Sequence, residues 1–266
     1  MDHFPARAAA FFDLDKTIIA TSSATAFSRP FLADGLITRG DVLRTAYAQF
    51  LYLMGGADAE QTERLRARLS AVSAGWSVAQ VTQIVRDTLH EHIQPTVFAE
   101  ALVLIDEHHA AGRDVIIVSA SGSEVVEPIA EMLAADHVVA TRMAVVDGRY
   151  TGDIDFYAYG ENKATAVREL AEAHGYDLTA SYAYSDSITD APMLSAVGHG
   201  VVVNPDRALR RLAVANGWEV ARFTRPITLA DRLRPAVPAA VGVTAVVVAA
   251  VVGLLLWRAS VRRRRA

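Results

Sequence analysis

Short apolar runs alternate with amphipathic stretches along most of the chain. The first run, residues 8–12, predicts a buried strand over residues 7–13. Further apolar runs predict strands at residues 115–118, 137–140, 182–184, 201–203 and 219–223. Helical periodicity fills the intervals at residues 95–111, 121–135, 162–174, 189–197 and 206–216. Strands that alternate with helices predict an α/β fold with a doubly wound, parallel, Rossmann-like sheet.

Two regions depart from this alternation. Residues 143–146 and 150–154 flank Asp147-Gly148, a dipeptide that favours a β-hairpin turn. Residues 20–94 carry helical patterning with few strand signals, and their glycine breaks predict helices at residues 24–33, 39–54, 59–73 and 78–92. Helices between two sheet strands predict an inserted cap. The expected organisation is therefore a core of residues 1–19 and 95–224 around a helical cap of residues 20–94.

The C-terminal region has a different composition. Residues 236–257 contain no charged side chain, and as a helix they would span roughly 33 Å, enough to cross a bilayer. Trp257 closes this segment, a basic tail of residues 258–266 follows, and residues 225–235 form a linker before it. No secretory signal precedes the core, so we expect a membrane-anchored protein with a cytoplasmic catalytic domain. The positive-inside rule would keep the arginine tail in the cytoplasm, so the orientation of the helix stays open.

Charge is distributed unevenly. The formal net charge is −4, but residues 231–266 hold seven Arg and one Asp, so residues 1–230 carry about ten negative charges in excess. An acidic core argues against a nucleic-acid partner, because phosphate backbones are bound by clustered Lys and Arg. The chain has no cysteine, which excludes disulfides, thiolate metal sites and a cysteine nucleophile. Nothing in the composition indicates an oligomeric state.

Asp13 and Asp15 follow the first apolar run in the stretch Phe12-Asp13-Leu14-Asp15-Lys16-Thr17. Residues i and i+2 of an extended strand share a face, so both carboxylates would point the same way at the carboxyl end of the sheet. Ligands bind at that edge in open α/β sheets. Crowded carboxylates need a cation or a shared proton. The alternative is a strand that ends in a solvated acidic turn.

Similar polar residues follow later strands. Ser119 ends the 115–118 strand just before a helix, where it could bind an anion or simply cap the helix. Lys163 begins the 162–174 helix, where a lysine opposes the helix dipole and is either solvated or facing an anion. Asp186 and Asp190 follow the 182–184 strand, where they could bind a ligand or cap a helix.

In this order, the four motifs resemble those of the haloacid dehalogenase superfamily of phosphotransferases over residues 7–223. The helical insert is similar to the cap of subfamily IB, the branch that includes phosphoserine phosphatase. The resemblance implies a Mg²⁺-dependent phosphatase that acts on phosphomonoesters. It also implies that Asp13 is the nucleophile that forms an aspartyl-phosphate, and that Asp15 is the general acid and base. Mg²⁺ would be held by Asp13, the Asp15 carbonyl oxygen and Asp186.

The resemblance assigns supporting roles to five further residues. Ser119, the backbone at Ala120 and Lys163 would bind the phosphate oxygens. Thr17 would brace the loop that holds the two acids. Asp190 would orient either Lys163 or a metal-bound water.

Two departures from the phosphoserine phosphatase pattern limit the substrate prediction. Ser22 stands where those enzymes typically carry a glutamate, and Thr189 stands where they usually carry an asparagine. Phosphatase chemistry is unaffected by either change, but phosphoserine is a doubtful substrate. A small soluble phosphomonoester is favoured. The alternatives are a lipid or membrane-precursor phosphate, and a non-catalytic interaction protein tethered to the membrane.

Two sets of basic residues complete the prediction. Cap residues that could meet a substrate anion are Arg29, Arg39 and Arg44, which the sequence does not rank. Four histidines on predicted helices have acidic neighbours and are expected on solvated faces rather than as metal ligands: His90, His92, His108 and His109.

Overall fold

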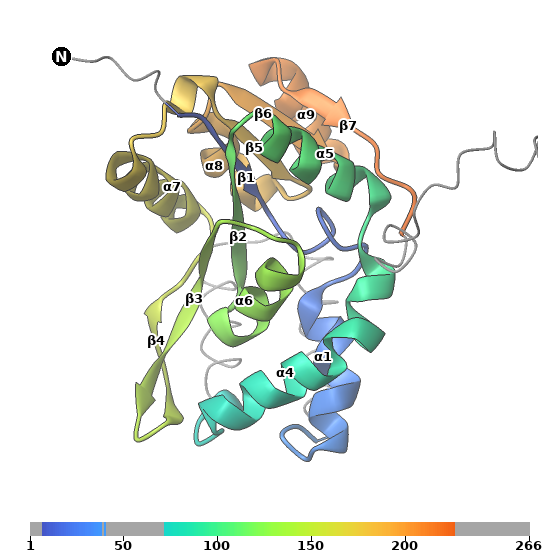
Figure 1. The fold of residues 1–266 in the computed structure, drawn as a ribbon, viewed down its shortest axis with the longest axis vertical. Coiled ribbons are helices and arrows are strands. Elements are labelled where there is room, and N and C mark those ends of the chain that lie inside the picture. Colours follow the sequence, from blue (N-terminus) through green and yellow to red (C-terminus); the bar gives the residue numbers. More distant parts are fainter. Residues whose placement is uncertain (1–6, 39, 41–71, 227–266) are drawn as a thin grey trace, which may run out of the picture. The chain divides into compact units, whose positions relative to one another are not determined.

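The computed structural model describes residues 7–38, 40 and 72–226. They form a seven-stranded sheet in the order β4-β3-β2-β1-β5-β6-β7 (Figure 1). The strands are β1 (Ala9–Phe12), β2 (Asp114–Gly122), β3 (His137–Val146), β4 (Arg149–Phe156), β5 (Tyr182–Ser185), β6 (His199–Val203) and β7 (Glu219–Ala221). Every pairing is parallel except that of β3 with β4. The predicted α/β fold with a mostly parallel sheet is confirmed.

Strand β1 lies at the centre of the sheet, between β2 and β5. Phe11 is in register with Ile116 of β2 on one side and with Ala183 of β5 on the other. The chain builds β2 and β3 outward from β1 and then returns to the opposite side to form β5. The strand order therefore reverses at β1, and the carboxyl ends of β1 and β5 lie at the position where ligands bind in open α/β sheets.

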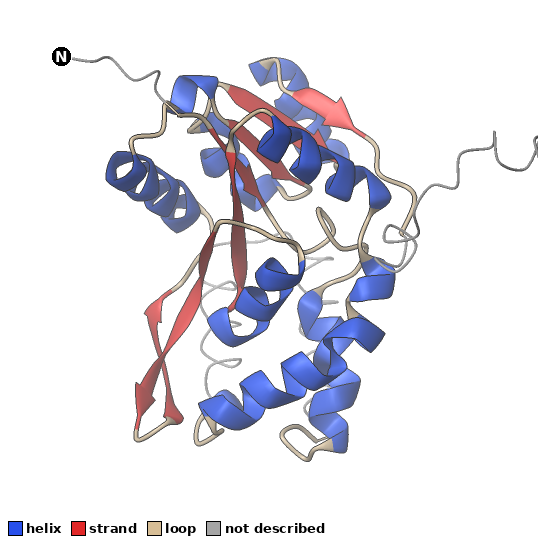
Figure 2. Cartoon of the chain, viewed as in Figure 1, coloured by secondary structure: helices blue, strands red, loops and turns tan. Residues whose placement is uncertain are grey.

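Helices connect the strands (Figure 2). The described α-helices are α1 (Ser23–Ala33), α4 (Val78–His92), α5 (Ala99–Ala110), α6 (Ser123–Met132), α7 (Glu161–His174), α8 (Ala191–Ser195) and α9 (Arg207–Asn216). Three short 3₁₀ turns accompany them: η1 (Gln94–Thr96), η2 (Leu178–Ala180) and η3 (Ile188–Asp190). Helix α7 ends at Gly175 with φ +70°, a left-handed conformation that glycine adopts at low cost.

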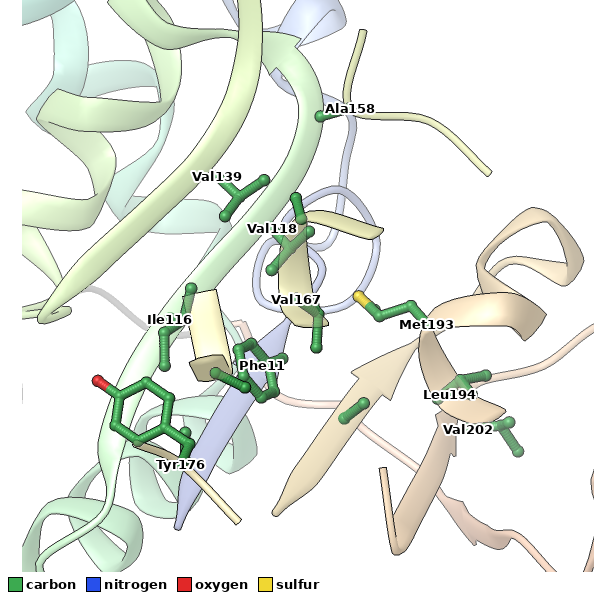
Figure 3. Packing of buried hydrophobic residues seen from close by; sticks show 14 of the residues in the cluster. Phe11, Ile116, Val118, Val139, Ala158, Val167, Tyr176, Met193, Leu194 and Val202 are labelled. Carbon is green, nitrogen blue, oxygen red and sulfur yellow. The ribbon is translucent and has the colours of Figure 1, made fainter. Parts of the chain in front are cut away.

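The hydrophobic core joins the central strands to α7 and α8 (Figure 3). Phe11 and Ile116 of neighbouring strands are fully buried, together with Val167 of α7 and Leu194 of α8. Burial of an apolar side chain of this size contributes about 1.5–3 kcal/mol. This packing fixes the start of α7, and hence Lys163, relative to the end of β1.

The β3–β4 hairpin turns at Asp147-Gly148, as predicted. Both residues have positive φ, +51° and +72°, which suits a two-residue hairpin turn. The hairpin is hydrogen-bonded to the start of α4 and to the residues before it: the amide of Gly75 donates to the Tyr150 carbonyl at 2.8 Å, and the amide of Val78 donates to the Gly148 carbonyl at 3.0 Å. The hairpin is thus attached to the helical insert.

Three predicted boundaries are wrong. The helix expected at 121–135 begins at Ser123, because β2 continues through Ser119 to Gly122 and pairs with β3. The helix expected at 95–111 is split, because the amide of Phe98 donates to the Ile18 carbonyl at 2.9 Å and holds the chain extended between η1 and α5. The helix expected at 189–197 is the turn η3 followed by the short helix α8.

Several predictions lie outside the described residues. Apart from residue 40, the helix expected at 39–54 lies outside them, and so does the helix expected at 59–73 apart from its last two residues. The others are most of the linker, the apolar segment 236–257 and the basic tail. Within the described ranges, no helix combines the length and the apolar character that crossing a membrane requires. The proposed division into core, cap, linker and membrane segment stays a prediction.

Candidate active site

The loop after β1 presents Asp13 at the carboxyl end of the sheet. The amide of Asp13 donates to the Tyr184 carbonyl at 2.9 Å, so the pairing with β5 extends one residue beyond the strand. The sequence predicts both acids on one extended strand. Instead, the strand ends at Phe12, and both acids lie in the loop that follows it. Thr17 Oγ1 lies 3.3 Å from Asp13 Oδ2 and accepts a hydrogen bond from the Asp186 amide at 3.1 Å. Thr17 thus links the two acidic loops.

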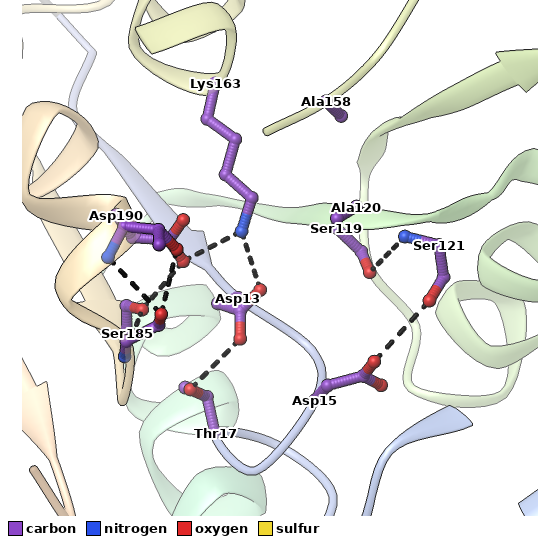
Figure 4. Close-up of polar contacts among 12 residues, drawn as sticks. Asp13, Asp15, Thr17, Ser119, Ala120, Ser121, Ala158, Lys163, Ser185 and Asp190 are labelled. Atoms are coloured by element: carbon purple, nitrogen blue, oxygen red, sulfur yellow. Dashed lines mark hydrogen bonds and ion pairs between the residues drawn. The ribbon is translucent and has the colours of Figure 1, made fainter. Parts of the chain in front are cut away.

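Lys163 reaches this loop from the first turn of α7 (Figure 4). Its side chain is buried, and Nζ lies 2.7 Å from Asp13 Oδ1 and 2.8 Å from Asp190 Oδ2. Ser185 Oγ donates to the same Asp190 oxygen at 2.7 Å. Of the two alternatives left open by the sequence, Lys163 therefore faces anions. Ser185 was not assigned a role from the sequence, although it immediately precedes Asp186.

The charges of the site do not balance without a further cation. Burial raises the pKa of Asp13 to about 8. The Lys163 ammonium only partly offsets this effect of burial, and the nearby carboxylates raise the pKa further: Asp190, Asp15 and Asp186. Burial also raises the pKa of Asp186 to about 6. For Lys163, burial alone would lower the pKa, but Asp13 and Asp190 together outweigh it and raise the pKa. Lys163 therefore stays protonated among an excess of carboxylates.

This donor set suits a hard divalent cation. Asp13 and Asp186 supply carboxylate oxygens, the ligands that Mg²⁺ prefers, and a bound cation would favour the ionised forms that burial disfavours. In the described part of the chain, no three acidic, histidine or cysteine side chains converge on one point. The expected ligand set does not need three, because it combines two carboxylates with the main-chain oxygen of Asp15, water and a phosphate oxygen. The residues present therefore fit Mg²⁺.

Asp15 has separate partners from Asp13. Its Oδ1 accepts the Ser23 amide at 2.8 Å, and its Oδ2 lies 3.2 Å from Ser23 Oγ and 3.5 Å from Ser121 Oγ. The two serine hydroxyls lie 2.7 Å apart. Burial raises the pKa of Asp15, although the Ser23 amide and hydroxyl oppose it. A carboxyl group with a raised pKa can donate a proton and take it back, which is the behaviour of a general acid and base. Neither serine had been singled out from the sequence.

Ser119 and Ala120 lie within β2 rather than at a helix N-terminus. Ser119 is buried, and its Oγ accepts a hydrogen bond from the Ser121 amide at 3.2 Å. The Ala120 carbonyl accepts a hydrogen bond from Thr141 Oγ1 at 2.7 Å. The expectation of a helix that starts just beyond Ser119 is therefore wrong, because Gly122 is the residue that precedes α6. Ile117, two residues before Ser119, is in register with Phe12 at the end of β1, so Ser119 lies on the strand next to the loop that carries Asp13.

One histidine prediction is wrong. His108 is only 3% exposed, although its sequence neighbours suggested a solvated face. Its Nε2 lies 2.8 Å from the Tyr184 hydroxyl, and its Nδ1 accepts a hydrogen bond from Arg113 Nε at 2.6 Å. His90 is exposed, as expected, and His92 and His109 are partly exposed. Among the three candidate bases for a substrate anion, Arg29 is exposed on α1, whereas Arg39 and Arg44 lie outside the described residues.

Comparison with known proteins finds relatives that match most of the chain. It is 57% identical over 267 residues to an inhibition of morphological differentiation protein of Streptomyces azureus, covering 98% of this chain and 96% of that one. It is 57% identical over 259 residues to a probable phosphatase of Mycobacterium tuberculosis, covering 95% and 90%. A phosphoserine phosphatase of the same organism is 37% identical over 218 residues, covering 81% and 71%.

A solved structure has the same fold. The protein, from Bordetella pertussis Tohama I and of unknown function, is 30% identical and superposes with a TM-score of 0.70, covering 81% of this chain and 98% of that one. The family model of haloacid dehalogenase-like hydrolases matches residues 10–195, which include Asp13, Lys163 and Asp190. The chain therefore belongs to the haloacid dehalogenase-like hydrolases and is an enzyme of the phosphatase type within that family.

Proposed function

We propose that the protein is a Mg²⁺-dependent phosphatase that hydrolyses a phosphomonoester through an aspartyl-phosphate on Asp13. The main support for this proposal is the buried ammonium of Lys163, which hydrogen-bonds to both Asp13 and Asp190 at the carboxyl end of β1. A buried cation beside a carboxylate lowers the electrostatic cost of bringing a phosphate dianion to that carboxylate. Bound Mg²⁺ would supply further positive charge between Asp13, Asp186 and the phosphate oxygens.

The chemistry follows from the two acids. An oxygen of Asp13 attacks phosphorus, the bond to the alcohol oxygen breaks, and the leaving oxygen takes a proton from Asp15. Water then attacks the aspartyl-phosphate, Asp15 takes a proton from that water, and Asp13 is released as a carboxylate. Lys163, the Ser119 hydroxyl and the backbone at Ala120 bind phosphate oxygens in both steps. Asp190 orients Lys163 through its 2.8 Å contact.

The preferred substrate is a small soluble phosphomonoester other than phosphoserine. A relative carries the name phosphoserine phosphatase. In this chain, however, Ser22 replaces the glutamate that helps recognise phosphoserine, and it serves instead as the N-cap of α1, accepting the Thr25 amide at 3.2 Å. Asp13, Asp15, Lys163 and the remaining acids are all present, which argues against a non-catalytic interaction protein.

The decisive experiment measures Mg²⁺-dependent release of phosphate by the full chain from a panel of soluble and lipid phosphomonoesters. Asp13→Asn should abolish release, whereas Asp34→Asn, which changes an exposed carboxylate at the end of α1, should leave it unchanged. Activity that survives Asp13→Asn would refute the mechanism. No turnover of any phosphomonoester would favour the non-catalytic alternative.

The uncharged segment 236–257 supports a second proposal, that the phosphatase is tethered to the membrane with its catalytic domain in the cytoplasm. It also keeps a lipid or membrane-precursor phosphate as the alternative substrate. The full chain should float with liposomes in a density gradient, and a chain that ends at residue 235 should not. If the substrate is a lipid phosphate, this truncation should lower kcat/KM for lipid substrates only. Equal flotation of both chains would contradict the tether.

A further inference from the structure

A cavity of about 430 Å³ opens beside Asp15. Its walls come from α1, from the segment before α4, from the start of α6 and from the β3–β4 hairpin, and much of the lining is apolar or aromatic: Phe27, Phe31, Trp76, Met143, Tyr150 and Ile154. Phe31 lies with its ring centroid 6.1 Å from that of Phe27 and 6.0 Å from that of Trp76. The volume is in the range of pockets that hold small organic ligands.

The position of the cavity connects it to the leaving group of the reaction. Lys163 and Asp13 do not line it, but Asp15, Ala120 and Ser121 do. Because Asp15 is the residue proposed to protonate the leaving oxygen, the alcohol part of the substrate would extend from Asp15 into this cavity. The phosphate itself would lie on the other side of Asp15, at Asp13 and Lys163.

The charge of the lining is one-sided. Among the described residues that line the cavity, the ionisable acids are Asp15 and Glu124, and none is a lysine, arginine or histidine. Glu124 is partly buried in the first turn of α6. It also lies close to Tyr150. Burial is the main cause that raises the pKa of the Tyr150 hydroxyl, and the Glu124 carboxylate is the second. A carboxylate on the substrate would lie in the same cavity as the like-charged groups of Glu124 and Asp15, and like charges brought together are costly.

We infer that this cavity binds the alcohol part of a phosphomonoester that is aromatic or bulky and apolar, and that carries a positively charged amine facing Glu124 rather than a carboxylate. The inference rests on the proposed phosphatase function and names the substrate class of the same site. The amine would pair with Glu124, and the aromatic rings of the wall would favour a cation further. Phosphoserine, which carries a carboxylate, would be disfavoured.

The test uses three aryl phosphates of similar size that differ in charge: 4-(2-aminoethyl)phenyl, 4-propylphenyl and 4-(carboxymethyl)phenyl phosphate. For the full chain with Mg²⁺, kcat/KM should fall in that order. Glu124→Gln should lower the preference for the amine over the propyl ester by about tenfold, the scale of one hydrogen bond to a charged group. The matched control is Glu127→Gln, an exposed glutamate on the same helix, which should leave the preference unchanged.

A binding measurement separates this inference from the proposed function. Calorimetry with the free phenols should show that 4-(2-aminoethyl)phenol binds the full chain and the Asp13→Asn variant, but binds Glu124→Gln about tenfold more weakly. If the phenol binds in this way and no ester is turned over, the proposed function fails, and only the preference of the cavity for an aromatic amine stands. The function stands and the inference fails if esters are turned over in an Asp13-dependent manner and either of two results is found. One is a kcat/KM for the carboxymethyl ester that equals or exceeds that for the amine ester. The other is a preference for the amine over the propyl ester that Glu124→Gln leaves unchanged. Failure of both measurements overturns both.

Discussion

The backbone amide of Ser23 lies 2.8 Å from Oδ1 of Asp15, and the hydroxyl of the same serine lies 3.2 Å from Oδ2. Ser23 is the first residue of α1, so the N-terminus of the first helix after the catalytic loop holds the carboxylate of the proposed general acid and base. A helix N-terminus favours a negative charge, whereas burial disfavours it and raises the pKa of Asp15. These opposing effects suit a group that must both give up and accept a proton.

Ser23→Ala should lower kcat by about tenfold with little change in KM. The variant loses the hydrogen bond from the Ser23 hydroxyl to the Asp15 carboxylate but keeps the hydrogen bond from the backbone amide. The lost hydrogen bond stabilises the ionised form, so the pKa of Asp15 should rise further. The acid limb of the kcat profile, where Asp15 must be ionised to activate water, should therefore move to higher pH. Steady-state kinetics between pH 5 and pH 8 would measure both effects.

Ser28→Ala is the matched control on the same helix. Among the described residues, the Ser28 hydroxyl donates to the Thr25 carbonyl at 2.7 Å, one turn earlier, and no hydrogen bond joins it to Asp15. Its kcat and pH profile should match those of the unchanged protein. An increase in KM at constant kcat in Ser23→Ala would mean that Ser23 binds substrate rather than positioning Asp15.

The sequence was informative about this site where the signal is local. Asp13, Ser119 and Asp186 each follow an apolar run, and parallel strands bring their carboxyl ends to one edge of the sheet. The mostly parallel sheet was predictable for the same reason, because apolar runs of strand length alternate with helical periods after residue 95. The Asp147-Gly148 turn was equally local, since only a few residue types favour positive φ at two successive positions.

Some of the contacts that were missed join residues far apart in the chain. Ser121 hydrogen-bonds to Asp15, which is 106 residues away in the sequence, and His108 hydrogen-bonds to Tyr184, which is 76 residues away. Neither contact follows from periodicity or from a short motif. The late start of α6 has the same origin, because pairing with β3 keeps the chain extended to Gly122 where local preference favoured a helix.

Lys163→Met should destabilise the fold, and more at high pH than at low pH. The variant would leave Asp13 and Asp190 buried without their shared cation, at a cost of about 3 kcal/mol. Without that ammonium, the folded-state pKa of Asp13, which burial already raises, rises further above its unfolded value. The stability of the variant is therefore retained at low pH, where Asp13 is protonated, and is lost as pH rises through its folded pKa. Urea unfolding with EDTA at pH 5 and pH 8 would measure the difference.

The double variant Lys163→Met/Asp190→Asn is the control for this effect. It removes one of the two uncompensated carboxylates and should recover part of the lost free energy of unfolding at pH 8, though not the activity. A loss that is the same at both pH values, and not relieved by Asp190→Asn, would point to lost packing of the lysine stem instead.

Binding of Mg²⁺ should release protons near neutral pH. Burial raises the pKa of Asp13 to about 8 and that of Asp186 to about 6, so the metal-free site is partly protonated at pH 7, and a cation requires both groups ionised. Affinity for Mg²⁺ should therefore tighten as pH rises from 6 to 8. Calorimetry in two buffers of different ionisation enthalpy would count the protons, and Asp186→Asn should bind Mg²⁺ more weakly. Affinity that is constant over this range would contradict the predicted coupling.

His108 should make the folded protein sensitive to acid. Burial, followed by the charge of Arg113 and then by His109, lowers the pKa of the His108 imidazole to about 4. Between that value and the ordinary histidine pKa near 6.5, the unfolded chain binds a proton that the folded chain does not. Stability contributed by the neutral imidazole is therefore present at pH 7 and is lost as pH falls, by about 1–2 kcal/mol at pH 5.

His108→Gln tests this coupling, because glutamine keeps a polar side chain beside Arg113 and Tyr184 but does not titrate. Urea unfolding at pH 7 and at pH 5 should show a smaller loss of stability for His108→Gln than for the unchanged protein, by about 1–2 kcal/mol. His90→Gln, which changes an exposed histidine on α4, should leave the pH dependence as it is. An unchanged slope in His108→Gln would mean that other buried groups, rather than this imidazole, set the acid sensitivity of the fold.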